Sequence, residues 1–181
     1  MLAIMTTDNL LPVTCEVPAS LLPWLAYKQS LTKRLQEKAG NTHLEILEQC
    51  WQAPDWWDKQ VLQINEEAVF HRKILMSSSG EPCWYARTVI PQSTYNAEKK
   101  IFNRLKKESL GTLVFKEAKI SRSSLIYYPI NTQSIEYHWP SENVLCQAET
   151  LWARLSIFVI DKNLPFCLIE IMLPGIMRFP N

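Results

Sequence analysis

The chain has 181 residues, of which 47% are hydrophobic and 20% charged, a composition typical of one globular domain with its own core. Nineteen basic and eighteen acidic residues leave a formal charge of +1, which argues against binding to nucleic acid or anionic membranes through bulk charge. The four glycines are too far apart to form a dinucleotide fingerprint or a P-loop, so no nucleotide cofactor is expected.

The first third of the chain predicts two helices and a strand. Residues 19–27 favour a short helix, and Ser30 can cap a second one that Gly40 is placed to end. Residues 42–51 are strand-like, and residues 54–60 indicate a loop or a helical turn.

Two hairpins are predicted further along. The strand-like runs 69–76 and 83–90 flank a turn-rich segment, and runs 151–160 and 166–173 flank a turn at 161–163. The segment between the hairpins predicts an amphipathic helix over 95–107, with weaker patterns over 111–115 and 119–128. Hairpins imply an antiparallel sheet with helices packed on one side, so the expected class is α+β. No linker or repeat divides the chain, and we expect one domain over residues 1–181.

Two charged residues lie among apolar neighbours in these hairpins. Residues two apart on a strand share a face, which groups Arg72 with Phe70 and Ile74. The same rule groups Glu170 with Leu168 and Met172 on the last strand. A buried charge costs several kcal/mol unless it is paired, so both side chains call for an explanation.

Two explanations remain open from this pattern alone. Arg72 and Glu170 can form a structural salt bridge with each other or with other partners. Alternatively, they can line a pocket for an anionic ligand, because the planar fork of arginine suits a carboxylate and glutamate can hydrogen-bond a ligand hydroxyl.

Other chemistries and locations are less well supported. His43, His71 and His138 are far apart, and no Cys or His pair has the spacing of metal ligands, so no metal site is expected. His71 lies on the strand face opposite Arg72, which favours a surface or packing role. The N-terminus lacks a basic region before its short apolar run, and the five cysteines are odd in number and scattered. We therefore expect no signal peptide, no membrane insertion and a cytoplasmic protein with reduced thiols.

Four segments then resemble one enzyme family, in the same order and with matching spacing. They span residues 24–174 and include the motifs RKILM from Arg72, GEP from Gly80, ARTVIP from Ala86, LGTL from Leu110, WARLS from Trp152 and EIMLP from Glu170. The chain thereby resembles the chorismate pyruvate-lyases. It departs from their pattern at Cys83, where tryptophan is usual, and at Leu155, where arginine is common.

The resemblance implies a fold and a site. The fold is a six-stranded antiparallel sheet with helices packed on one face and helical flaps over an internal ligand cavity. By the same resemblance, Arg72 binds the carboxylate of substrate and product, Glu170 meets the ring hydroxyl, and Leu31 and Leu110 line the cavity from the flaps.

The implied reaction eliminates the enolpyruvyl group of chorismate as pyruvate and leaves 4-hydroxybenzoate, the first committed step of ubiquinone biosynthesis. Aromatisation drives it, so no cofactor or metal is expected, and the protein supplies placement and electrostatics. We predict Arg72 and Glu170 as the catalytic pair, and Arg87 and Arg154 as candidates for the second carboxylate of chorismate. The expected partners are chorismate and 4-hydroxybenzoate, with no nucleic acid, and the expected state is a monomer.

A second function class shares this type of fold. The ligand-sensing domains of bacterial transcription regulators bind small molecules without catalysis, so a non-catalytic domain that binds an aromatic carboxylate is the alternative. Those sensors normally follow a DNA-binding helix-turn-helix domain, and the chain before Trp24 is too short for one. We therefore favour the enzyme.

Overall fold

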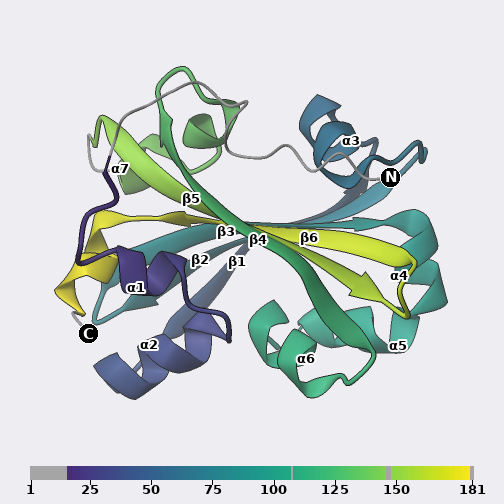
Figure 1. The fold of residues 1–181 in the computed structure, drawn as a ribbon, viewed down its shortest axis with the longest axis horizontal. Coiled ribbons are helices and arrows are strands. Elements are labelled where there is room, and N and C mark those ends of the chain that lie inside the picture. Colours follow the sequence, from purple (N-terminus) through teal and green to yellow (C-terminus); the bar gives the residue numbers. More distant parts are fainter. Residues whose placement is uncertain (1–15, 107, 146–147, 180–181) are drawn as a thin grey trace.

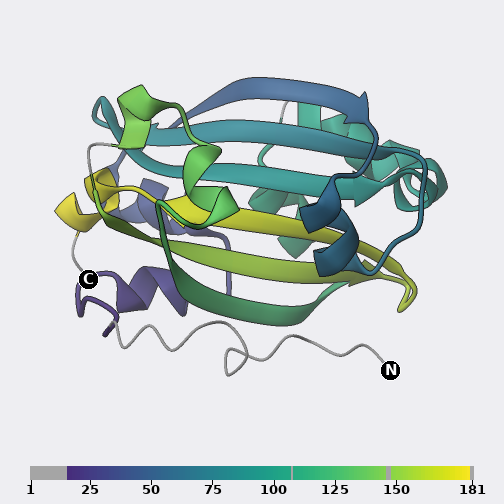
Figure 2. The ribbon, with the colours of Figure 1, turned by 90° about the horizontal axis from the view of Figure 1, so that it is seen from above.

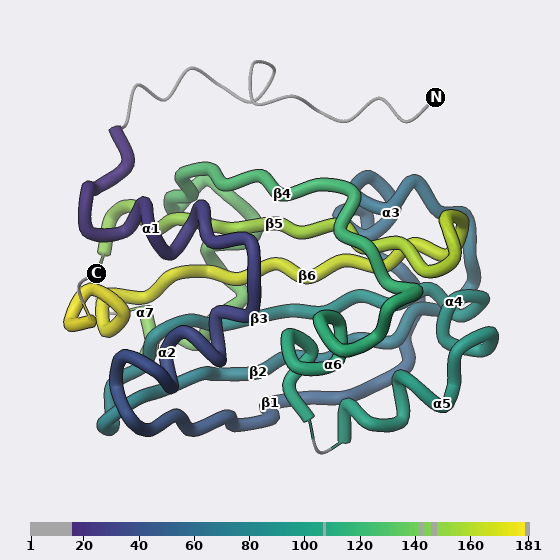
Figure 3. Tube along the Cα trace, turned by 60° about the horizontal axis from the view of Figure 1, so that its bottom comes forward, coloured from purple at the N-terminus to yellow at the C-terminus, as the bar shows by residue number. Residues whose placement is uncertain are grey.

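The computed structural model describes residues 16–106, 108–145 and 148–179. Within these ranges six strands form one antiparallel sheet in the order β1-β2-β3-β6-β5-β4, as Figure 3 shows. Edge strands β1 and β4 lie at opposite sides of the sheet when it is viewed from above (Figure 2). The strands are β1 (His43–Gln52), β2 (Val69–Ser78), β3 (Glu81–Pro91), β4 (Ile120–Asn131), β5 (Thr150–Ile160) and β6 (Leu164–Met172).

Short helices precede β1, follow β6 and connect β1 to β2, β3 to β4 and β4 to β5, whereas tight turns join β2 to β3 and β5 to β6. The α-helices are α1 (Leu22–Leu25), α2 (Leu31–Ala39), α3 (Trp56–Leu62), α4 (Gln92–Ala97), α5 (Lys99–Phe102), α6 (Leu110–Lys116) and α7 (Glu142–Leu145). The 3-10 helices are η2 (Asn103–Lys106), η3 (Ile135–His138) and η4 (Pro174–Arg178). Within the described ranges, no helix is long and apolar enough to cross a membrane.

Both faces of the sheet are covered. The larger core lies under α1, α2, α5 and α6, which Figure 1 shows below the sheet. A second core on the opposite face lies under α3, η3 and α7, and it includes Trp57, Tyr137 and Leu145. The predicted α+β class and six-stranded antiparallel sheet are confirmed, and the structure adds this smaller helical layer to the one that was expected.

Local signals account for the start and the end of α2. The Ser30 hydroxyl accepts a hydrogen bond from the backbone N–H of Lys33, so it satisfies one free donor of the first turn. Gly40 ends the helix in the left-handed conformation with φ of 76°, which a residue without Cβ adopts at little cost.

The predicted helix over 95–107 is instead three short pieces. Glu98 has φ of −126° and ψ of 38°, outside the helical region, so α4 ends there and α5 begins. The Glu98 carboxylate pairs with Lys119 at 2.6 Å, which ties this break to the start of β4. The amphipathic pattern persists across the break because Ile101, Phe102 and Leu105 still enter the larger core.

Candidate active site

Arg72 is a buried cation that has no carboxylate partner among the described residues. It lies in the middle of β2 and only 2% of its surface is exposed. Its Nη2 donates to the backbone carbonyl of Glu108 at 3.2 Å, while its Nε is buried with no hydrogen-bond partner in residues 16–106, 108–145 and 148–179. No ion pair joins it to an acidic side chain in the described parts of the chain. Burial lowers the pKa of Arg72 to about 10, so the group is still a cation at neutral pH.

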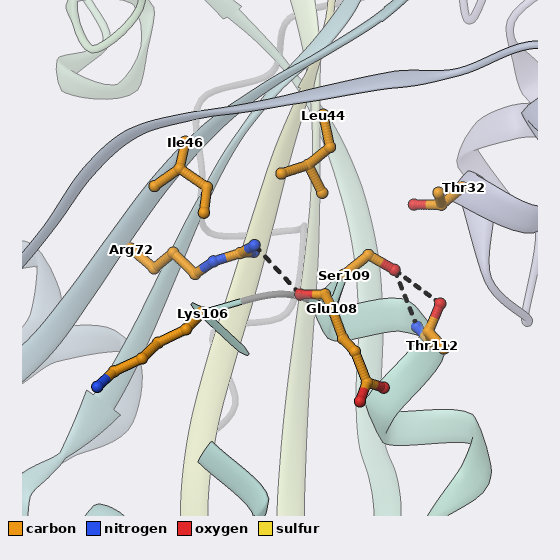
Figure 4. Close-up of a pocket in the computed structure, with 8 residues that line it drawn as sticks. All are labelled: Thr32, Leu44, Ile46, Arg72, Lys106, Glu108, Ser109 and Thr112. Carbon is orange, nitrogen blue, oxygen red and sulfur yellow. Dashed lines mark hydrogen bonds between the residues drawn. The ribbon is translucent and has the colours of Figure 1, made fainter. Parts of the chain in front are cut away.

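An open pocket of about 520 Å³ leads to this guanidinium. Leu44 and Ile46 of β1 lie on one side of Arg72, and Lys106, Glu108, Ser109 and Thr112 lie on the other (Figure 4). The Lys106 side chain runs away from the guanidinium, so Arg72 is the cation directed into the interior of this pocket (Figure 4). The pocket therefore offers a route from solvent to a buried positive charge.

Glu170, in contrast, is already paired. It lies on β6 directly opposite Arg154 of β5, whose Nη1 donates to its carboxylate. Arg154 also donates from Nε to the carbonyl of Leu25 at 3.1 Å and from Nη2 to the carbonyl of Tyr27. The structural salt bridge suggested for Glu170 is therefore present with another partner, Arg154, whereas a direct pair between Arg72 and Glu170 is wrong.

Glu170 faces a second, enclosed pocket beneath the helices α2 and α6. Leu31 and Leu110, the first residues of these helices, line it together with Arg154 and Leu168. Its free volume is about 10 Å³. By the same measure a site for one water molecule needs about 10–15 Å³, so this pocket has room for about one water, and an aromatic ring can enter only when the side chains that line it move.

The two helices meet closely over this pocket. A Cβ added to Gly111 would lie 2.9 Å from the Ser30 Oγ, a separation shorter than real Cβ contacts. Ser30 and Gly111 line the enclosed pocket, whereas Thr32 and Ser109 line the open one. The first turns of α2 and α6 thus form a partition between Arg72 and Glu170.

The sheet places Arg72 and Glu170 at a definite separation on one face. Arg72 pairs with Thr88 of β3, and Thr88 pairs with Leu168, two residues before Glu170. Two strand spacings of about 4.8 Å and two residues of about 3.4 Å along the strand put the Cα atoms about 12 Å apart. That interval suits an arginine and a glutamate that hold opposite ends of one six-membered ring.

Arg87 lies on the opposite face of the sheet, away from both pockets. Its Nη2 contacts Asp55 at 2.8 Å and Asp58 at 2.7 Å, and its guanidinium lies 4.3 Å from the centre of the Trp139 ring. His71 contacts the same Asp58 at 2.9 Å and is buried, which agrees with a packing role. The structure therefore does not bring Arg87 to Arg72, because neighbouring strand positions alternate between faces.

One residue of the enclosed pocket was missed by sequence reasoning. Arg122 of β4 lines it beside Arg154 and Glu170. Its Nη1 donates to the carbonyl of Lys28 at 2.7 Å. Strand alternation does not find it, because a bulge between Arg122 and Ser124 changes the face on which the following residues lie.

Comparison with known proteins supplies a family. The model of the chorismate lyase family matches residues 10–178. A protein of Methylobacillus flagellatus named "Probable chorismate pyruvate-lyase" is 25% identical over 159 residues, which cover 87% of this chain and 89% of the relative. A protein of Coxiella burnetii with the same name is 28% identical over 168 residues, which cover 89% of each chain.

Solved structures share the fold at low sequence identity. The ligand-binding domain of a GntR-family regulator from Bordetella bronchiseptica aligns with a TM-score of 0.54 and 13% identity, over 75% of this chain and 85% of that domain. A GntR-family regulator from Bacillus cereus aligns with a TM-score of 0.55 and 13% identity, over 74% of this chain and 92% of that chain. These similarities concern the fold alone.

Proposed function

Because the chain belongs to the chorismate lyase family, we propose that it converts chorismate to 4-hydroxybenzoate and pyruvate. We place this reaction at the first committed step of ubiquinone biosynthesis and the enzyme in the cytoplasm as a monomer of one domain. The C3–O ether bond of chorismate breaks, the hydrogen on C4 leaves as a proton, and the enolpyruvyl methylene gains a proton to become the methyl group of pyruvate. The ring becomes aromatic, which supplies the driving force.

The observation that carries this proposal is the unneutralised charge of Arg72. Three arginines are buried on the sheet, and two of them, Arg87 and Arg154, contact carboxylates of this chain. Within the described part of the chain, the one hydrogen bond of Arg72 is to a carbonyl, although removing a cation from water without a counter-ion is costly. An anionic ligand supplies the missing partner, and the ring carboxylate of chorismate and of 4-hydroxybenzoate has the right charge and planar shape.

Glu170 then receives the other end of the ring. A carboxylate bonded to the Arg154 guanidinium still has lone pairs that can accept a hydrogen bond from the ring hydroxyl. In this arrangement Glu170 positions the ring, and Leu31 and Leu110 exclude water above it. We therefore assign Glu170 a role as an acceptor rather than as an acid.

The test is to supply the purified protein with chorismate and no added cofactor. The proposal predicts pyruvate and 4-hydroxybenzoate in equal amounts, followed by coupled lactate dehydrogenase and by absorbance of the aromatic product. Tight binding of 4-hydroxybenzoate with no pyruvate release would contradict it and support a non-catalytic binding domain, the alternative with which the GntR-type fold agrees.

A further inference from the structure

The proposed substrate carries a second carboxylate, and the end of the site at which this group lies follows from the chemistry of the substrate. Chorismate carries one carboxylate on C1 and another on the enolpyruvyl ether at C3, beside the hydroxyl on C4. If Arg72 holds the C1 carboxylate and Glu170 the hydroxyl, the ether carboxylate lies at the Glu170 end of the site. The product 4-hydroxybenzoate lacks this second carboxylate.

The two arginines predicted to bind the enolpyruvyl carboxylate, Arg154 and Arg87, already form ion pairs with carboxylates of this chain. Arg154 already donates from Nε, Nη1 and Nη2 to Leu25, Glu170 and Tyr27. Arg87 lies on the opposite face of the sheet with Asp55 and Asp58. Neither can turn to a substrate without breaking a buried ion pair, which is costly.

Arg122 is the remaining arginine of the enclosed pocket, and it has unused capacity. Its Nη1 donates to the carbonyl of Lys28, but its Nε is buried with no hydrogen-bond partner in the described ranges. The guanidinium lies 5.1 Å from the centre of the Phe158 ring and 5.3 Å from that of Phe115. Burial and the charge of Arg154 lower the pKa of Arg122 to about 10 although the charge of Glu170 raises it, so a further anion beside Arg122 would stabilise its cation.

Ser156 adds a second unsatisfied polar group on the same face. Its residue is 0% exposed, and its Oγ is buried with no hydrogen-bond partner among the described residues. The register places it on β5 between Leu168 of β6 and Leu125 of β4. Its neighbours on the same face of β5 are Arg154 and Phe158. A buried hydroxyl without a partner is unusual. Ser156 itself does not line the pocket, but Arg154, Phe158 and its cross-strand partner Leu168 do, so a ligand that displaces part of this lining can supply the missing partner.

We propose that Arg122 and Ser156 bind the enolpyruvyl carboxylate of chorismate. This inference rests on the proposed function and adds to it the residues that distinguish substrate from product. Arg72 and Glu170 contact groups that both molecules carry, whereas Arg122 and Ser156 contact a group that leaves with pyruvate. The subsite therefore binds chorismate in preference to 4-hydroxybenzoate, and its contacts to the ring-bound ligand are lost when the ether bond breaks.

The test compares two ligands that share the ring carboxylate and the hydroxyl but differ by a carboxymethoxy group on C3. The probes are 4-hydroxybenzoate and 3-(carboxymethoxy)-4-hydroxybenzoate, a stable aromatic acid whose ether carboxylate mimics the enolpyruvyl group. Calorimetry on Arg122→Met is expected to show binding of the dicarboxylate weakened about 10- to 100-fold, as for loss of a charge-assisted hydrogen bond, and binding of 4-hydroxybenzoate changed less than twofold. Ser156→Ala is expected to weaken dicarboxylate binding about 3- to 10-fold with the same selectivity.

Two controls keep the result interpretable. Arg122→Lys retains a cation and a donor for the carbonyl of Lys28, so it should recover part of the dicarboxylate affinity. Equal weakening of both probes in Arg122→Met and Ser156→Ala, or no weakening of the dicarboxylate, would overturn the subsite. Because these are binding measurements, they stand apart from pyruvate release by the wild type, whose absence would overturn the proposed function.

Discussion

Replacement of Arg154 tests whether the buried ion pair with Glu170 is structural support for the site. Arg154→Met removes three hydrogen bonds and leaves the Glu170 carboxylate buried without a cation. Breaking one side of a buried pair typically costs about 3–5 kcal/mol of unfolding free energy. For a chain of this size each kcal/mol lowers Tm by about 2–4 °C, so the expected loss is about 6–20 °C.

The double variant Arg154→Met, Glu170→Met completes the comparison. Replacing both partners of a buried pair by apolar groups is often close to neutral, so the double variant should recover most of the stability that the single variant loses. Arg72→Met is the matched control, because it removes a buried cation that has no carboxylate partner. It should leave stability unchanged or raise it.

Urea unfolding, followed by tryptophan fluorescence, measures the unfolding free energy of wild type, Arg154→Met, the double variant and Arg72→Met. The reasoning is refuted if Arg154→Met costs less than about 1 kcal/mol, the value of an exposed pair. It is also refuted if the double variant is less stable than Arg154→Met, or if Arg72→Met destabilises the protein as strongly as Arg154→Met does.

Three further predictions follow from local geometry. Gly111→Ala should lower the unfolding free energy in urea by about 1–3 kcal/mol, because the new Cβ lies 2.9 Å from the Ser30 Oγ and overpacks the contact between α2 and α6; adding Ser30→Gly should recover most of the loss, and an unchanged urea midpoint in Gly111→Ala would contradict this. Burial raises the pKa of Asp55, but the hydrogen bond and charge of Arg87 lower it more, and the net pKa lies below its usual value. The ionised Asp55 therefore stabilises the fold above about pH 4, and this stabilisation is lost as the pH falls through the lowered pKa. The difference in urea midpoint between wild type and Asp55→Asn should become smaller from pH 5 to pH 3, and a constant difference would contradict this. Lys162 has φ of 69° in the β5–β6 turn, so Lys162→Gly should raise the unfolding free energy by about 0.5–1 kcal/mol in urea, and a decrease would contradict the strain.

Much of the architecture was accessible from the sequence because the hairpins are strongly patterned. Alternation along β2 and β6 placed Arg72 and Glu170 on apolar faces, and the register now shows that these are the same face. The partner of Glu170 was also accessible. A turn at 161–163 pairs Ile160 with Leu164, and counting back six residues along β5 and forward six along β6 pairs Arg154 with Glu170.

Other features depend on contacts between distant segments. The side of the sheet on which Arg87 lies follows from its pairing with Lys73. Its partners Asp55 and Asp58 lie at the start of α3, where the local pattern predicts only a loop or a helical turn. The segment 129–150 offered no clear pattern, because η3 and α7 are single turns held by packing on the second core. The face of β4 on which Arg122 lies could not be predicted by strand alternation, because a bulge interrupts the alternation between Arg122 and Ser124.

The central claim is that Arg72 is a buried cation whose counter-ion is the ring carboxylate of the ligand. The direct measurement is the binding of 4-hydroxybenzoate and of the uncharged 4-hydroxybenzamide to wild type and to Arg72→Met. The account predicts that the substitution weakens binding of the acid by about 100-fold or more, as for a desolvated charge pair, and changes binding of the amide only a few-fold. Retention of wild-type affinity for 4-hydroxybenzoate in Arg72→Met would contradict it.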